Sequence, residues 1–352
     1  MKHKTQTQSR QRKRHSLKLP PWPSLIASSM VGIGAITIAR TAQITATLPP
    51  NALLGETTVA TKILMDESSW IYATAISPNG TTSVVGTYDG QIRILDLRTG
   101  LVLRTFQAHD DAISSLAISP DGSMLASASW DNHVKVWNLQ TGTLKNDLVG
   151  HTDDVRAVAF TPDGTKVVSG GYDKKLQVWN WKTGSLLHLR EDPASIISLV
   201  VTPDNDTLVT GDTNGMIHVS SVKTGKLLYR FKAHNKTIWS LAMSADGKTL
   251  ASASQDRTLK LWDLETGKLR TAILAHSQAV LAVAFSSDGR TLATSSYDGM
   301  IKLWDAQNRE LLQILTGHDK AVFSITFTPD SHSLISGSTD TTVKLWRNHN
   351  LR

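Results

Sequence analysis

Residues 233–267 read AHNKTIWSLAMSADGKTLASASQDRTLKLWDLETG and contain three short runs of apolar, β-branched or small residues, namely TIWSLAM, TLASAS and TLKLWDL. Turn-forming residues separate these runs, at Ser244 to Gly247 and at Gln255 to Arg257. A fourth run, KLRTAIL, follows before Ala275 and His276 begin the next copy. The stretch therefore predicts a unit of four short β-strands joined by tight turns.

Near-copies of this unit fill the chain from about residue 60 onward. The second turn carries an aspartate, replaced once by an asparagine, at Asp89, Asp131, Asp173, Asn214, Asp256, Asp298 and Asp340. Successive positions are 42 residues apart, except for one step of 41. A period of this length suits one four-stranded sheet per unit, with the sheets arranged radially. The sequence thus predicts an all-β fold, a seven-bladed β-propeller of four-stranded antiparallel blades.

Each unit resembles a WD40 repeat. The Trp-Asp pair of that family stands at 262–263 and 304–305, with Trp-Asn at 137–138 and 179–180 and Trp-Arg at 346–347. The opening Gly-His stands at 150–151 and 317–318, and Ala precedes His109, His234 and His276. The resemblance covers roughly residues 57–346. It implies the propeller and a non-catalytic WD40 scaffold for protein–protein interaction.

The resemblance also implies a structural tetrad in each unit, a hydrogen-bonded chain of His, Ser or Thr, Asp and Trp. Five units hold all four residues: His109, Ser127, Asp131, Trp137; His151, Ser169, Asp173, Trp179; His234, Ser252, Asp256, Trp262; His276, Thr294, Asp298, Trp304; and His318, Ser336, Asp340, Trp346. The first unit has Glu67 and Leu95 in place of His and Trp, and the fourth has Asp192 and Ser220. Because a buried polar group without its partner costs ~1–3 kcal/mol, we expect blades one and four to be the least rigid.

The seventh unit lacks a fourth strand of its own, since only residues 347–352 follow Trp346. The segment Thr58 to Leu64, TVATKIL, precedes Glu67 as VLRTF precedes His109. We therefore expect residues 58–64 to complete the last blade as its outer strand and to close the ring. The predicted organisation is a basic tail with an apolar segment (1–40), a linker (41–56), the propeller (57–346) and a C-terminal tail (347–352).

The N-terminal tail carries the basic excess of the chain. Residues 1–40 hold eight Lys or Arg and no acidic residue, whereas the remainder has 29 basic against 30 acidic residues. The propeller therefore lacks the basic bias that favours nucleic-acid binding. Residues 25–39, LIASSMVGIGAITIA, are uncharged. As a helix they would reach ~22 Å, less than a membrane core of about 30 Å but suited to an export signal.

The order basic, apolar, small favours export or membrane anchoring through residues 25–39. The alternatives are a cytoplasmic protein whose basic extension holds an incidental apolar patch, and a basic tail that touches nucleic acid. The sequence does not decide whether residues 25–39 are cleaved or retained, and it does not reveal the oligomeric state.

Catalytic motifs are absent from the sequence. The chain has no Cys, and the recurrent His stand once per blade, which denies them metal-ligand spacing. No nucleophile elbow, phosphate-binding loop or zinc-protease motif occurs. We therefore expect no enzyme activity, no metal and no cofactor.

Positions that differ between blades are the candidates for partner binding. One set precedes the turn aspartate: Tyr88, Trp130, Tyr172, Thr213, Gln255, Tyr297 and Thr339. The other lies five residues after the His position: Tyr72, Ser114, Arg156, Ile197, Trp239, Leu281 and Phe323. Because Trp, Tyr and Arg anchor protein interfaces, we expect a rim that binds a protein or peptide. Its predicted residues are Trp70, Tyr72, Tyr88, Trp130, Arg156, Tyr172, Trp239, Leu281, Tyr297 and Phe323.

The first-choice patch within this rim belongs to blades six, seven and one, with Trp130 beside it. Two alternatives stay open. Some of the rings could simply cover their own tetrads. The chain could also be a propeller enzyme or small-ligand binder that uses the central channel, which would require several ionisable side chains at the channel mouth.

Overall fold

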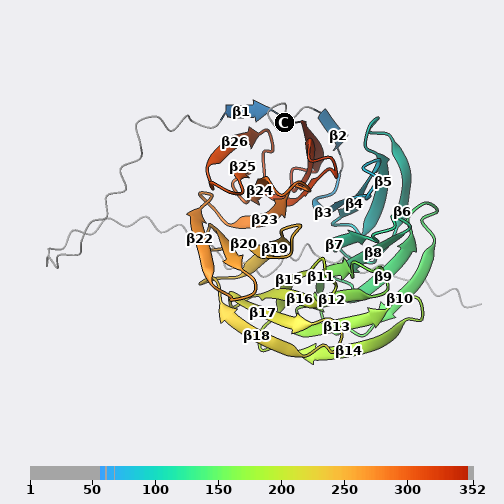
Figure 1. Cartoon of the computed structure of the whole chain (residues 1–352). Helices are drawn as coiled ribbons and strands as arrows, with labels where there is room; N and C mark the ends of the chain where they lie inside the picture. The colour runs from blue at the N-terminus through green and yellow to red at the C-terminus, as the bar shows by residue number, and fades with distance from the viewer. Residues whose placement is uncertain (1–55, 60–61, 67, 348–352) are drawn as a thin grey trace, which may run out of the picture. The chain divides into compact units, whose positions relative to one another are not determined.

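The computed structural model describes residues 56–59, 62–66 and 68–347. Within these ranges the chain forms 29 β-strands and no α-helix (Figure 1). Accordingly, the described part has no helix of the length and apolarity needed to cross a bilayer. The tail at residues 1–40, the linker up to residue 55 and the last five residues lie outside the described ranges.

Seven sheets follow one another along the chain, and each is a blade. Blade one contains β3 (Ile71–Ile76), β4 (Thr82–Thr87), β5 (Gln91–Asp96) and β6 (Val102–Gln107). Blade two contains β7 (Ile113–Ile118), β8 (Met124–Ser129), β9 (His133–Asn138) and β10 (Leu144–Val149). Blade three contains β11 (Val155–Phe160), β12 (Val167–Gly171), β13 (Lys175–Asn180) and β14 (Ser185–Glu191). Blade four contains β15 (Ile196–Val201), β16 (Thr207–Asp212), β17 (Met216–Ser221) and β18 (Leu227–Lys232).

The last three blades repeat this plan. Blade five contains β19 (Ile238–Met243), β20 (Thr249–Ser254), β21 (Thr258–Asp263) and β22 (Leu269–Leu274). Blade six contains β23 (Val280–Phe285), β24 (Thr291–Ser296), β25 (Ile301–Asp305) and β26 (Leu311–Thr316). Blade seven contains β27 (Val322–Phe327), β28 (Ser333–Ser338) and β29 (Thr342–Arg347).

The blades surround a central channel. The first strand of each blade contacts the first strand of the next, and β27 of blade seven contacts β3 of blade one, so the ring is closed (Figure 1). The pairs between consecutive strands of each blade are antiparallel. The prediction of a seven-bladed propeller with four-stranded blades is confirmed.

An N-terminal strand completes blade seven, as expected, but its bounds differ from the prediction. The closing strand is β2 (Lys62–Asp66), which pairs antiparallel with β29. The beginning of the predicted segment lies instead in β1 (Glu56–Val59), which runs parallel to β26 as a fifth strand of blade six. Without β1, the outer edge of β26 would leave its backbone N–H and C=O groups unpaired, and β1 pairs with this edge.

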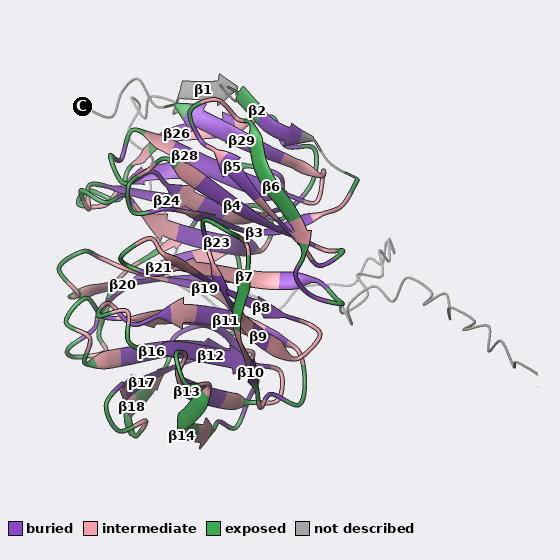
Figure 2. Cartoon of the chain, turned by 90° about the vertical axis from the view of Figure 1, so that its right-hand side faces the viewer, coloured by how far each residue is buried: buried purple, intermediate pink, exposed green. Residues whose placement is uncertain are grey.

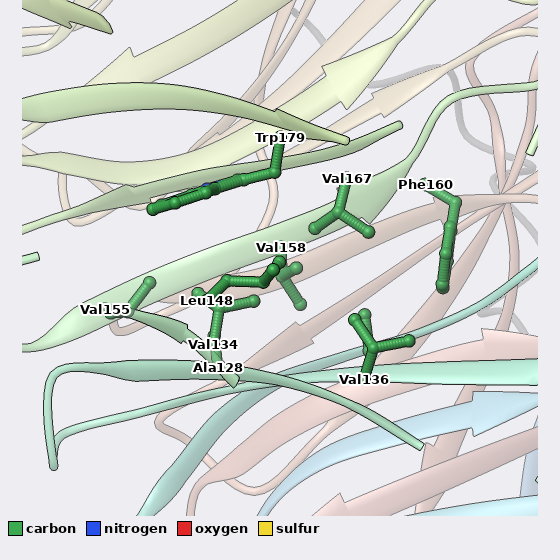
Figure 3. Close-up of a cluster of buried hydrophobic side chains, with 10 residues drawn as sticks. Ala128, Val134, Val136, Leu148, Val155, Val158, Phe160, Val167 and Trp179 are labelled. Carbon is green, nitrogen blue, oxygen red and sulfur yellow. The ribbon is translucent and has the colours of Figure 1, made fainter. Parts of the chain in front are cut away.

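The hydrophobic core lies between adjacent blades. Figure 3 shows one such layer, in which Val134, Val136 and Leu148 of blade two pack against Phe160 and Trp179 of blade three. The corresponding layer between blades seven and one includes Leu64 and Met65 of the closing strand. The outer strands β6, β14, β18 and β22, by contrast, are largely exposed, as Figure 2 shows for β6. Burial therefore fixes how the blades stack, and the loops at the two ends of the blades remain open to variation.

Candidate interaction surface

Five blades contain the hydrogen-bonded tetrad implied by the family pattern. In blade two, His109 Nδ1 lies 2.8 Å from the Asp131 carboxylate and its Nε2 lies 2.7 Å from Ser127 Oγ. The Trp137 indole N–H donates to the same hydroxyl at 2.9 Å. The equivalent bonds of blades three, five, six and seven span 2.7–3.2 Å. When the carboxylate accepts a hydrogen bond from Nδ1–H, Nε2 is free to accept one from the hydroxyl. Every polar group of the tetrad therefore has a hydrogen-bond partner.

The tetrad aspartates remain ionised because they accept several hydrogen bonds. Burial by itself would raise the pKa of Asp131, but the hydrogen bond from His109 and those from two backbone N–H groups lower it to about 2. The aspartates of the other four tetrads shift in the same direction for the same reasons. Each tetrad thus ties the loop that precedes an inner strand to the turn of the same blade.

Blade four replaces the tetrad with a buried ionic network. Arg190 donates two hydrogen bonds to the Asp192 carboxylate, at 2.8 and 2.7 Å, and a third to Ser220 Oγ. His218 lies 3.2 Å from Asp212 and 3.8 Å from Asp192. These contacts supply other polar interactions in place of the tetrad, although the buried Thr210 hydroxyl and His218 Nδ1 make no hydrogen bond among the described residues, and low rigidity of blade four stays a prediction.

Blade one replaces the tetrad with apolar packing. Val85 stands at the Ser position and Leu95 at the Trp position, and both are fully buried. They belong to the cluster that also contains Leu64 and Met65 of the closing strand. Glu67, at the His position, lies outside the described residues.

The residues that lie five positions after the His position all owe their side-chain orientation to the same structural feature. Every inner strand has a β-bulge near its start, and the extra residue in it is Tyr72, Ser114, Arg156, Ile197, Trp239, Leu281 or Phe323. A bulge re-aims the side chain of its extra residue. All seven line a cavity of about 190 Å³ in the central channel. We call these seven residues the bulge ring.

The residues before the turn aspartate are also held alike in every blade. The backbone N–H of Tyr88 donates to the carbonyl of Trp70 at 2.9 Å, and six equivalent bonds of 2.8–3.0 Å occur around the ring. These bonds place each variable turn residue beside the loop that leads into the bulge. The two variable sets therefore lie at the same end of the blades.

Aromatic contacts join part of both sets into one surface. Tyr72 is the centre, with ring centroids 4.8 Å from Phe323, 5.5 Å from Trp130 and 6.0 Å from Tyr88. Trp70 lies 5.2 Å from Tyr88 and 6.4 Å from Tyr72. Tyr72 is only 7% exposed, so it supports the surface, while the rings of Trp70, Tyr88, Trp130 and Phe323 are half-buried and partly accessible.

Arg156 extends this surface into blade three. Its guanidinium carbon lies 5.1 Å from the centre of the Trp130 ring and 5.4 Å from that of Tyr172. Stacking of this kind is a favourable cation–π contact. We call the joined set the rim cluster, which comprises Trp70, Tyr72, Tyr88, Trp130, Phe323, Arg156 and Tyr172.

The remaining predicted rim residues lie elsewhere on the same end. Leu281 is 4% exposed and lines the channel, as does the half-buried Trp239. Tyr297 is 45% exposed. The ring contacts described above join residues of blades one to three with Phe323 of blade seven, while the preference for a patch on blades six, seven and one stays a prediction.

Sequence reasoning missed a lysine two residues before the tetrad Trp. Lys135 Nζ donates to the Ala108 carbonyl at 2.9 Å, and Lys260 and Lys302 make the same bond at 2.7 Å to the residue before their own His. Lys344 bonds in the same way to Gly317. The constant spacing from Trp could have revealed these lysines. Each of them hydrogen-bonds the backbone of the loop that contains the tetrad His.

The described residues contain no group of three or more His, Cys, Asp or Glu that could hold a metal ion. The closed ring and its repeated tetrads define a seven-bladed β-propeller of the WD40 type. The chain belongs to the IFT122 first beta-propeller family, whose model matches residues 70–347. Propellers of this family typically act in protein interactions and are generally non-enzymatic. No curated protein matches the sequence significantly.

Proposed function

We propose that this protein is a non-catalytic scaffold that binds a protein or peptide segment on the rim cluster. The observation that carries the proposal is the continuous run of aromatic rings in tilted and edge-on contact, together with Arg156, at one end of the blades. Trp, Tyr and Arg are the residue types that contribute most to protein interfaces. Rings already packed against one another lose little conformational freedom when a partner binds.

The channel supports this proposal over the alternative of a propeller enzyme. Among the described residues that line the channel cavity, Arg156 is the only one with a full charge. Acid–base catalysis needs a positioned proton donor or acceptor near the reacting group. The lining instead consists of apolar side chains and hydroxyls, which suits contact better than proton transfer.

The test is affinity capture from native extract with the full chain. The rim variant carries Trp70→Ala, Tyr88→Ala and Trp130→Ala, which leaves the buried Tyr72 in place. The control variant carries Leu101→Ala, Leu228→Ala and Leu274→Ala, three strongly exposed side chains on or beside outer strands. We expect a protein that the parent and the control variant retain and the rim variant loses. A partner retained equally by all three chains would contradict the proposal, provided that circular dichroism shows them folded.

Export or membrane anchoring through residues 25–39 remains a separate proposal, because that segment lies outside the described residues. It is supported only by the order of basic, apolar and small residues. Expression with and without residues 1–40, followed by fractionation and N-terminal sequencing of the product, would test it.

A further inference from the structure

Arg156 differs from every other member of the bulge ring. The other six side chains are aromatic, aliphatic or hydroxyl groups, and none of them carries a full charge at neutral pH. A lone cation at the mouth of an otherwise uncharged cavity is costly unless something compensates it. The structure shows two aromatic faces against Arg156 and no carboxylate hydrogen-bonded to it among the described residues.

The guanidinium group of Arg156 has unused hydrogen-bonding capacity. It stacks on Trp130 and Tyr172. Its Nε is buried and makes no hydrogen bond among the described residues, and the same is true of the indole Nε1 of Trp130. Two neighbouring N–H donors therefore lack acceptors. The guanidinium lies over the rings of Trp130 and Tyr172, and its N–H edge is the part where a carboxylate binds in bidentate fashion.

The loops beside Arg156 limit the charge of the incoming group. Burial raises the pKa of Asp154 to about 6 despite the charge of Arg156, and the carboxylates of Asp153 and Asp111 act in the same direction as burial. These acidic groups would repel a doubly charged phosphate about twice as strongly as a singly charged carboxylate. The surroundings thus favour a carboxylate over a doubly charged phosphate.

The rest of the cavity indicates what stands beside that carboxylate. Trp239, Leu281 and Phe323 line the same channel mouth as Arg156. Such a lining favours a bulky apolar neighbour, because burying apolar surface is favourable.

We propose that Arg156 binds the side-chain carboxylate of an Asp or Glu in the partner segment, with a bulky apolar residue of that segment seated in the channel mouth. This inference rests on the proposed function of the rim cluster and names the chemistry that the cluster selects. The Arg156 edge and the Trp130 indole supply the donors, and the apolar members of the bulge ring supply the contact surface.

The experiment uses the immobilised full chain and four pools of short acetylated and amidated peptides. The pools are randomised except at the central position, which is Glu, Gln, Lys or phosphoserine. We expect the Glu pool to be retained about tenfold more than the Gln pool, as a charge-assisted hydrogen bond requires. Arg156→Gln should bring the Glu pool down to the Gln level, and Arg156→Lys, which keeps the charge but not the planar fork, should leave an intermediate preference.

Two further variants separate recognition from folding and from general charge. Lys236→Gln removes one exposed positive charge from the His loop of blade five and should leave the Glu preference unchanged. Trp130→Phe keeps a ring beside Arg156 but removes the indole donor, and it should weaken retention of the Glu pool. Equal retention of the Glu and Gln pools by the parent would overturn the proposal. Stronger retention of the Lys or phosphoserine pool, lost in the rim variant, would also overturn it while leaving the rim cluster as the binding surface.

Discussion

In the five blades that have a tetrad, the Ser or Thr is the residue on which the hydrogen-bonded chain depends most, because its hydroxyl bonds both the His and the Trp. Thr294 in blade six accepts from Trp304 and bonds His276, both at 2.9 Å. Thr210 occupies the same strand position in blade four, where its buried hydroxyl makes no hydrogen bond among the described residues. The two threonines have the same shape and burial but a different hydrogen-bonding role.

Thr294→Val should therefore lower the free energy of unfolding by roughly 2–6 kcal/mol, because two buried partners each lose a hydrogen bond at ~1–3 kcal/mol. Thr210→Val is the matched control and should be neutral or slightly stabilising. Chemical denaturation of both variants measures the difference. Equal losses at the two positions would show that the hydroxyl bonds do not hold the blades.

Arg190 has the corresponding role in blade four. Arg190→Met leaves the Asp192 carboxylate, whose side chain is 4% exposed, without its main partner. Removing one member of a buried ion pair typically costs ~3–5 kcal/mol, and we expect a loss of that order. Arg230→Met, on the exposed outer strand of blade four, should change stability little. A small effect of Arg190→Met in thermal unfolding would mean that the network contributes little to the blade.

The two N-terminal strands have different roles at the scale of secondary structure. β2 inserts Leu64 and Met65 into the core between blades seven and one, with 7% and 6% exposure. β1 is added to the outer edge of a blade that already has four strands. Closure of the ring therefore depends on β2 and not on β1.

Truncation separates these roles. A chain that begins at Ala60 lacks β1 and should unfold at nearly the parent temperature. A chain that begins at Glu67 also lacks β2 and should lose several kcal/mol, because burial of each large apolar side chain contributes roughly 2–5 kcal/mol. Thermal unfolding of both chains tests the assignment. Equal melting temperatures would contradict it.

Sequence reasoning succeeded where a feature repeats and failed where it depends on pairing between strands. The period of the turn aspartates and the tetrad residues predicted the number and order of the strands. The bulge that turns Tyr72 and Arg156 toward the channel depends on two residues opposing one in the adjacent strand, and no residue type marks it. The ionic network of blade four joins Arg190 and Asp192 to Asp212 and His218 from other strands, outside the repeated pattern.

At the scale of the whole propeller, the described residues form a closed ring that gathers variable residues at one end. Tetrads, the blade-four network and apolar packing hold the blades, and the seven bulges deliver variable side chains to the same place. The scaffold residues recur, while the rim cluster gathers in only part of the ring. This contrast is what supports a binding role for the cluster, and the export of the protein through residues 25–39 is an independent prediction.

The most direct test of the central proposal is photo-crosslinking from the rim cluster. The full chain would carry benzoylphenylalanine in place of Tyr88, or in place of the exposed Leu228 on the outer strand of blade four, and would be irradiated in native extract. We expect a discrete crosslinked partner from position 88 and none from position 228. No adduct at position 88, or the same adduct at both positions, would contradict the assignment of the rim cluster as the binding surface.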